Sequence, residues 1–195
     1  MAQTKIVVDT NAYFRLAQNI HPLLCRPFGQ EQYTLYAHAD LNTELKNVIR
    51  VRGKLDWVSQ PKYIAARKRS LTLSKINKKE INKNYDYMWG HALEEFHQPE
   101  GKGPSQVDTL ILATALALDI YVVTDDQDML KLAQDFEVKQ MTSLELMKLM
   151  FDQKHIDLEK IKQVVEQWQF DKETPHKNWE TEYKNLFGHS PPRYS

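Results

Sequence analysis

The chain has 195 residues, in which 26 Lys and Arg are balanced by 26 Asp and Glu, with one Cys and 42% hydrophobic residues. This length and composition are typical of one folded domain with its own core, and they exclude a chain that is disordered throughout. A single Cys also excludes an intramolecular disulfide framework and a thiolate-rich zinc site, as expected in a reducing compartment.

Neither a secretory signal nor a membrane span is expected. Only three apolar residues, Ile6 to Val8, precede Asp9, which is too short for the apolar part of a signal peptide. The most apolar stretch, Leu110 to Leu118, is well short of the roughly 20 residues that cross a bilayer. We therefore expect a cytoplasmic protein with no membrane partner.

Strands and helices alternate along most of the chain. Short apolar or β-branched runs predict strands at residues 5–8, 33–37, 120–123 and 137–140. Apolar residues at helical spacing, with capping residues, predict helices at about residues 10–17, 39–50, 105–118, 126–134 and 142–151, and two more between 61 and 97. The alternation predicts an α/β fold in which helices flank a mostly parallel central sheet as a three-layer sandwich.

We assign residues 1–151 to this domain and residues 152–195 to a helical C-terminal extension. Apolar residues before and after the Thr174-Pro175 break predict two helices there. We expect the apolar side chains in these helices to pack either against the domain or in an oligomer contact; they are Trp168, Trp179 and Phe187.

The neutral total hides a separation of charge along the sequence. Between Lys46 and Lys83 there are twelve cationic residues and only two acidic ones, a net charge of +10, so the remainder carries −10. This stretch lies within a basic helical segment of about residues 46–98, which we call the basic segment.

Acidic residues are predicted to gather at the carboxyl edge of the sheet, where functional groups of open α/β sheets lie. Asp9 ends the first strand, and Asp126 and Asp128 follow the strand at 120–123, while helices bring Asp108 and Glu44 toward the same edge. Converging carboxylates need a cation, and an all-oxygen set favours Mg²⁺ or Mn²⁺ over zinc. Such a metal would activate water against a phosphodiester.

Each acid also has a purely structural explanation. Asp9 could simply cap a helix, Ser105 and Asp108 fit a capping box, and Asp126 and Asp128 stand at a helix start. Glu44 could be a solvated surface acid. Capping does not explain why these helix starts should share one edge of the sheet.

Four motifs in order resemble those of PIN-domain ribonucleases, over about residues 5–151. They are Val7-Val8-Asp9-Thr10-Asn11, Leu41-Asn-Thr-Glu44-Leu, Val107-Asp108-Thr-Leu-Ile-Leu-Ala113 and Val123-Thr124-Asp125-Asp126-Gln-Asp128-Met129. The resemblance implies an endoribonuclease that depends on Mg²⁺ or Mn²⁺ and cuts RNA with metal-activated water.

The resemblance also assigns roles to individual residues. Asp9, Glu44, Asp108 and Asp126 match the metal-site acids and Asp128 the usual additional acid, while Thr10, Asn11 and Thr124 match small polar residues that orient the carboxylates. Many small relatives, including VapC-like toxins, are toxins of toxin-antitoxin pairs that dimerise, so an antitoxin partner and a homodimer are expectations. Here the stretch between Glu44 and Asp108 is longer than in compact toxins, and about forty residues follow the usual end.

The basic segment is the candidate RNA-binding surface, because Lys and Arg contacts to phosphates supply most of the sequence-independent affinity. The candidates are Arg67, Lys68, Arg69, Lys75, Lys78, Lys79 and Lys83, and the aromatic residues among them that could stack on bases are Tyr63, Tyr85, Tyr87 and Trp89. Solvated helix faces and core packing, or docking of an acidic protein, would explain the same residues.

Two other functions compete with the nuclease. A non-catalytic RNA- or protein-binding module could keep the same fold, but all the acid positions are filled here, which favours catalysis. A phosphatase or receiver-type protein using Asp9 for phosphoryl transfer lacks an Asp-x-Asp after the first strand and an obvious strand-end Lys.

Overall fold

The computed structural model describes residues 3–38, 41, 45, 56–69, 71–98 and 101–194. Four parallel strands form one sheet in the order β2-β1-β3-β4. Their bounds are Lys5–Val8 for β1, Thr34–Ala37 for β2, Tyr121–Val123 for β3 and Gln140–Met141 for β4. Val8 pairs with Ala37 on one side and with Val123 on the other, so these three strands end together at one edge.

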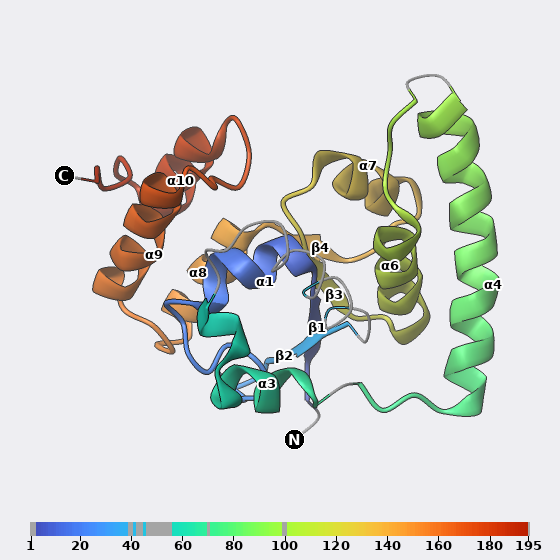
Figure 1. Ribbon diagram of the computed structural model, residues 1–195, viewed down its shortest axis with the longest axis horizontal. Helices are drawn as coiled ribbons and strands as arrows, with labels where there is room; N and C mark the ends of the chain where they lie inside the picture. Colours follow the sequence, from blue (N-terminus) through green and yellow to red (C-terminus); the bar gives the residue numbers. More distant parts are fainter. Residues whose placement is uncertain are drawn as a thin grey trace.

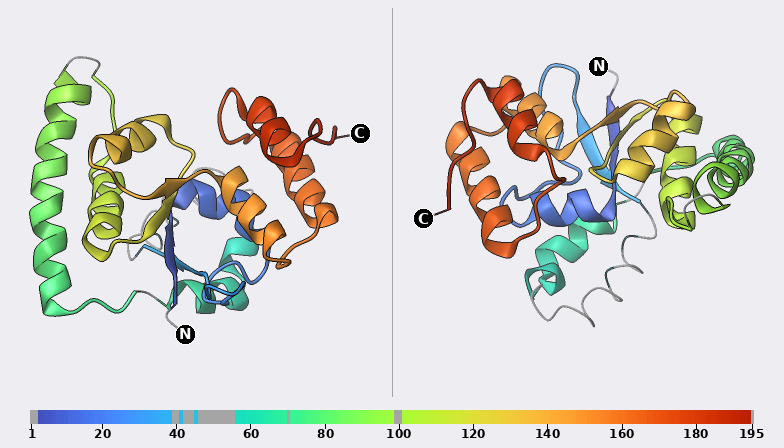
Figure 2. Two further views of the ribbon diagram at one scale, coloured as in Figure 1. Left: turned by 180° about the vertical axis from the view of Figure 1, so that it is seen from behind. Right: turned by 90° about the horizontal axis from the view of Figure 1, so that it is seen from above.

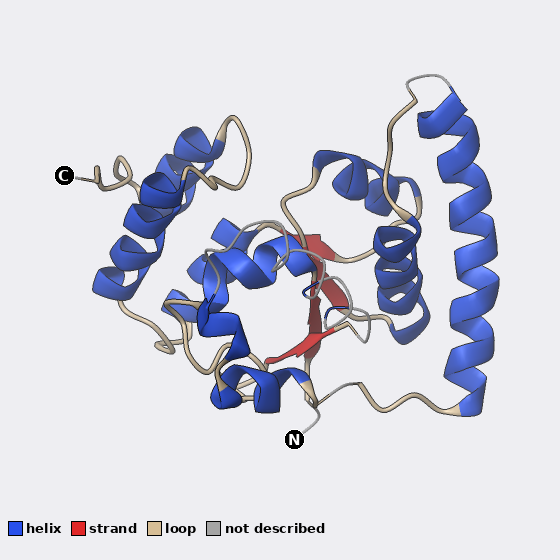
Figure 3. Ribbon diagram, in the orientation of Figure 1, coloured by secondary structure: helices blue, strands red, loops and turns tan. Residues whose placement is uncertain are grey.

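Helices surround this sheet (Figures 1 and 3). They are α1 (Thr10–Ala17), α3 (Pro61–Arg67), α4 (Lys75–Ala92), α6 (Gln106–Leu118), α7 (Gln127–Asp135), α8 (Ser143–Asp152), α9 (Leu158–Asp171) and α10 (Trp179–Phe187). A 3₁₀ turn, η1 (Asp56–Ser59), precedes α3, and a π-helical segment, η2 (Leu93–His97), continues α4.

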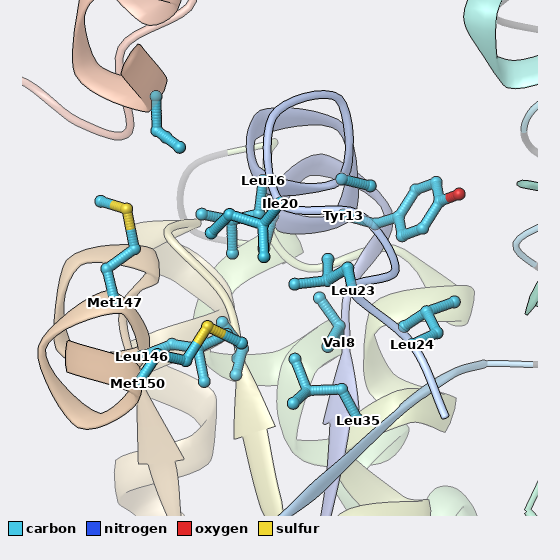
Figure 4. Packing of buried hydrophobic residues seen from close by; sticks show 14 of the residues in the cluster. Val8, Tyr13, Leu16, Ile20, Leu23, Leu24, Leu35, Leu146, Met147 and Met150 are labelled. Carbon is cyan, nitrogen blue, oxygen red and sulfur yellow. The ribbon is translucent and has the colours of Figure 1, made fainter. Parts of the chain in front are cut away.

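The two faces of the sheet follow from the alternation of side chains along each strand. Ile6, Val8 and Val123 pack on one face with α1, α8 and the C-terminal helices, in the core shown in part in Figure 4. Val7 and Val122 point to the other face, where they pack with α4, α6 and α7. Both faces are covered, which confirms the predicted α/β fold with a parallel sheet between layers of helices.

Most predicted elements occur within a few residues of their expected positions, and two helices do lie between residues 61 and 97. The predicted strand at 137–140 is wrong in its bounds. Glu137 has a positive φ of 54° and the Val138 N–H bonds to the Ala133 carbonyl, so these residues close α7 and only Gln140 and Met141 join the sheet. The predicted helix at 39–50 lies largely outside the described residues.

The C-terminal helices share the core of the sheet. Ile161, Val165, Trp168 and Tyr183 are buried in the same cluster as α1 and α8, and the extension lies at the end of the molecule opposite α4 (Figure 2). No helix within the described ranges has both the length and the apolar character needed to cross a membrane.

Candidate functional site

Asp9 follows β1 directly and caps α1. Its Oδ1 accepts the Ala12 N–H at 2.5 Å, and its Oδ2 accepts the Thr124 hydroxyl at 2.5 Å. Only 3% of the residue is exposed. Burial raises the pKa of Asp9 from 3.8 to about 7; the two hydrogen bonds oppose the rise, Asp125 adds to it and Arg15 opposes it. Asp9 is therefore both a helix cap and a buried carboxylate whose charge is costly.

Thr124 joins the ends of β1 and β3. It lies one residue beyond β3, is fully buried, donates its hydroxyl proton to Asp9 and accepts the Asp126 N–H at 3.2 Å. Asp126 in turn caps α7, with its Oδ1 accepting the Met129 N–H at 2.9 Å, and the residue as a whole is exposed. One threonine thus fixes the spacing between the two loops that carry Asp9 and Asp126.

Asp108 reaches the same edge from α6. Because α6 connects to β3 through a tight turn at Asp119, the two elements run in opposite directions, and the start of α6 lies beside the end of β3. Asp108 accepts the Ser105 N–H at 2.9 Å in a capping box. Burial raises the pKa of Asp108, and the hydrogen bonds to Ser105 oppose this rise. The charge of Asp126 adds to the rise, so the two carboxylates are close enough to interact electrostatically.

The chemistry of these acids suits a hard cation, although the described residues do not form a complete ligand set. Asp9, Asp108 and Asp126 offer only oxygen donors at one edge, and a cation would stabilise the charge that burial disfavours. Within the described ranges, no three His, Cys, Asp or Glu side chains converge closely enough to hold a metal ion. Glu44, the fourth predicted ligand, lies outside those ranges.

The other predicted site residues lie around this edge. Thr10 and Asn11 open α1, and Asp128 lies in the first turn of α7. Asn11 is exposed, whereas Thr10 and Asp128 are half-buried. The Thr124 hydroxyl donates a hydrogen bond to Asp9, and its role beside a metal site stays a prediction.

Sequence reasoning missed the role of Asp125. Its side chain is fully buried, pairs with Arg15 Nη1 at 2.9 Å, and accepts the Ser143 N–H at 2.8 Å and the Ser143 hydroxyl at 2.6 Å. Asp125 therefore anchors the loop between Thr124 and Asp126 to α1 and to the start of α8. Its partners are far away in sequence, so no local pattern could have indicated them.

The C-terminal extension supports the same loop through contacts with Arg15 and with the start of α8. Trp168 Nε1 donates to the Arg15 carbonyl at 2.9 Å, and Arg15 Nε donates to the Glu173 carbonyl at 3.3 Å. Thr142, next to Ser143, donates its hydroxyl proton to Glu182 of α10. The helices beyond residue 152 thus hold Arg15 and the start of α8, which together hold Asp125.

Arg67 is the clearest correction among the RNA-binding candidates. It is 7% exposed, and its guanidinium donates to the Tyr13 hydroxyl at 3.1 Å and to the Val58 carbonyl at 2.8 Å. Tyr63, one of the proposed stacking residues, is also buried in the core. Arg67 joins α3 to α1 and η1, and Tyr63 packs against His21 and Trp57, so both side chains are closed to a nucleic acid.

The other described candidates are exposed, and four of them lie on α4. These exposed candidates are Lys68, Arg69, Lys75, Lys78, Lys79 and Lys83. The far end of α4 meets the start of α6, because the His97 ring bonds to the Pro104 carbonyl at 3.0 Å. At 1.5 Å per residue, Lys83 lies roughly 20 Å and Lys75 roughly 30 Å along the helix from that end. Tyr87, 68% exposed, lies between.

No family model matches the sequence, and no curated protein matches it. Among solved structures, the chain is similar to one described as the crystal structure of FitAcB from Neisseria gonorrhoeae. The similarity has a TM-score of 0.45 at 16% sequence identity, and it covers 71% of this chain and 97% of that one.

Proposed function

We propose that this protein is a metal-dependent endoribonuclease of the PIN-domain type, with its site at the carboxyl edge of the sheet. The observation that carries the proposal is the Asp9–Thr124–Asp126 linkage, with Asp108 brought to the same edge by α6. A purely structural helix cap would not need to be buried where its negative charge is destabilised, as the charge of Asp9 is.

Asp9, Asp108 and Asp126, with Glu44, are the residues that would hold Mg²⁺ or Mn²⁺, with Asp128 as the additional acid. When bound, the metal supplies a water of lowered pKa close to the phosphodiester. Thr124 keeps the Asp9 carboxylate fixed in orientation, and Asp125 keeps the loop that carries Asp126 in place. The chain itself need not supply a covalent nucleophile.

The exposed cations of the basic segment would bind the RNA backbone at positions distant from the cleaved bond. Since Lys75 to Lys83 lie roughly 20 to 30 Å along the helix from the end that meets the start of α6, we expect a bound strand to span several nucleotides if it touches both these lysines and the acids. We therefore expect very short oligonucleotides to be poor substrates.

The proposal is tested by incubating mixed RNA substrates with wild type and Asp9→Asn, in Mg²⁺, in Mn²⁺ and in excess chelator. Wild type should cut in metal only, and Asp9→Asn should lose at least about 100-fold in rate. The matched control is Asp119→Asn, the same chemical change at an 82% exposed side chain on the opposite edge. Asn is well tolerated in the left-handed conformation that Asp119 adopts.

A substrate with a single 2′-deoxynucleotide at the cleaved position tests the mechanism. Attack by water does not need the 2′-hydroxyl, so cleavage should persist there. Cleavage in chelator, or full activity of Asp9→Asn, would contradict the proposal. No cleavage by wild type in either metal would instead support the second candidate, a non-catalytic RNA- or protein-binding module. An antitoxin partner, a homodimer and a cytoplasmic location stay predictions of the resemblance and the sequence.

A further inference from the structure

A cavity of about 450 Å³ opens between α3 and the loop that follows α1, and nothing in the proposed catalysis uses it. Its volume is within the range of sites that bind small molecules. Apolar side chains such as Leu24 and Ala66 line part of it. The polar part consists of His21, the thiol of Cys25 and three cations.

The three cations are Arg26 from the loop, Lys62 from the first turn of α3 and Arg69 just beyond its end. All three are exposed, and none forms an ion pair with a carboxylate among the residues that the structure describes. The lining contains no Asp or Glu. Three like charges around one cavity repel each other, and an anion between them would relieve that repulsion.

The field of these cations acts on the groups inside. After burial, Lys62 is the second cause that lowers the pKa of His21, so the ring is largely neutral at pH 7 and can donate one N–H. Burial raises the pKa of the Cys25 thiol, and Arg69 opposes that rise. Burial is the larger cause of both shifts, but the contributions of Lys62 and Arg69 have the sign that nearby positive charges give.

Two other cavities show that this arrangement is specific. The cavity between α8 and α9 has Lys154 and Lys160 but also Asp152 and Asp157 in its lining, so its charges cancel. The cavity beside α9 carries Glu166 and no Lys or Arg. Of these three cavities, only the one beside α3 combines several cations with no acid.

We propose that this cavity binds the phosphate group of a nucleotide unit, with Arg26, Lys62 and Arg69 neutralising the phosphate and the apolar wall covering the base or sugar. The unit can be a free nucleotide or part of an RNA strand. Binding does not require the proposed cleavage, so either proposal can fail alone.

The single cysteine of the chain gives a direct measure of occupancy. Cys25 is half-buried in the cavity wall, where its thiol lies 3.7 Å from the Ala66 carbonyl, and the sequence has no other Cys. Alkylation by iodoacetamide is measured in chelator with AMP, with inorganic phosphate, or with a fluorescein-labelled octaribonucleotide. A ligand in the cavity should slow the reaction at least about threefold.

The variant Lys62→Gln/Arg69→Gln should lose this protection and bind the labelled RNA at least about fivefold more weakly. Its salt dependence should be shallower by about 0.7 in log–log slope, because about 0.7 is expected per neutralised phosphate on a single strand and the cavity holds one phosphate. The control is Lys160→Gln/Lys162→Gln, which removes one half-buried and one exposed cation of α9 and should change neither quantity. Lys62→Arg/Arg69→Lys, which keeps both charges, should retain protection.

The arms with AMP and RNA identify the source of the phosphate. Protection by AMP, which also displaces the RNA, indicates a free nucleotide site; protection by RNA alone indicates a backbone contact. Equal alkylation rates with and without every ligand, or equal RNA affinity and salt slope in the two double variants, would overturn the proposal. Binding that fails while Asp9-dependent cleavage persists would leave the nuclease proposal intact.

Discussion

The two charged regions of the molecule, the acids at the sheet edge and the lysines of α4, differ in how far their charged side chains are buried. At the sheet edge, Asp9 and Asp125 are buried and bound by short hydrogen bonds from residues that are distant in sequence. Along α4, Lys75 to Lys83 are exposed on one helix at the side of the molecule (Figure 1). Among the Lys and Arg residues of the basic segment that the structure describes, only Arg67 is buried in the core.

This difference indicates a division of labour. A carboxylate that must meet a cation at a fixed place needs a rigid surrounding, and burial makes its interaction with that cation strong. Cations that hold a flexible backbone of any sequence need only be numerous and accessible, since each contact is weak and additive. The sharpest effects of substitution should therefore lie at the acids, and the mildest along α4.

The largest effect is expected at Asp108. Asp108→Asn removes the charge but leaves an oxygen that can still accept the Ser105 N–H, so α6 should keep its cap. The cleavage rate should fall at least about 100-fold, with circular dichroism and melting temperature close to wild type. Replacing Asp119 by Asn should leave the rate unchanged. A fall of less than about threefold at Asp108 would remove it from the site.

A large effect on stability is expected from the pH dependence that Asp9 imposes. Its pKa is about 7 in the folded chain, against an ordinary value of 3.8 when unfolded, so between these values the folded state binds more protons. The stabilisation is therefore complete below pH 4 and is lost as the pH rises to 7, by at most about 4 kcal/mol. Denaturant unfolding in chelator at pH 5 and pH 8 measures the part of this loss that falls above pH 5.

Asp9→Asn is the matched variant for this measurement, because the amide stays neutral at every pH. It should be the more stable protein at pH 8, and its stability should fall less between pH 5 and pH 8 than that of wild type. Parallel curves for the two proteins would show that the carboxylate of Asp9 is not protonated as its burial requires.

A smaller effect is expected at the anchor behind the loop. Arg15→Met leaves Asp125 buried without its cation, although Ser143 still donates two hydrogen bonds. Unfolding free energy should fall by about 2 to 3 kcal/mol. Lys148→Met, which breaks an exposed pair with Asp152, should cost less than about 0.5 kcal/mol. Equal costs for the two variants would contradict the role given to Asp125.

The smallest effect is expected on α4. Lys79→Gln/Lys83→Gln should weaken RNA binding only severalfold and make its salt dependence shallower by about 1.4, with the cleavage rate at saturating RNA unchanged. Fluorescence anisotropy at several salt concentrations measures both. The control is Lys160→Gln/Lys162→Gln. An unchanged slope would show that α4 does not contact phosphates.

Local sequence patterns predicted the architecture and the start of each acidic loop, because strands, caps and helical spacing are short-range features. Asp9 and Asp108 were expected as caps and as edge residues, and each is a cap at the edge where β1 and β3 end. The strand at 137–140 was misplaced because the positive φ of Glu137 closes α7, and a non-glycine residue gives little warning of that conformation.

The contacts that hold the site could not be predicted in this way. Asp125 meets Arg15 across 110 residues and Ser143 across 18, and Trp168 meets Arg15 across 153. Arg67 shows the converse: a residue within a basic run looks like a surface cation, yet tertiary packing against Tyr13 buries it. Such pairings depend on the whole fold and leave no trace in local composition.

The most direct test of the acidic site is the binding of Mn²⁺ itself, measured by electron paramagnetic resonance at pH 7.5. Wild type and Asp119→Asn should take up Mn²⁺ saturably with the same affinity, and Asp9→Asn and Asp108→Asn should each bind it at least about tenfold more weakly. No saturable binding by wild type, or equal binding by all four proteins, would contradict the account of this edge as a metal centre.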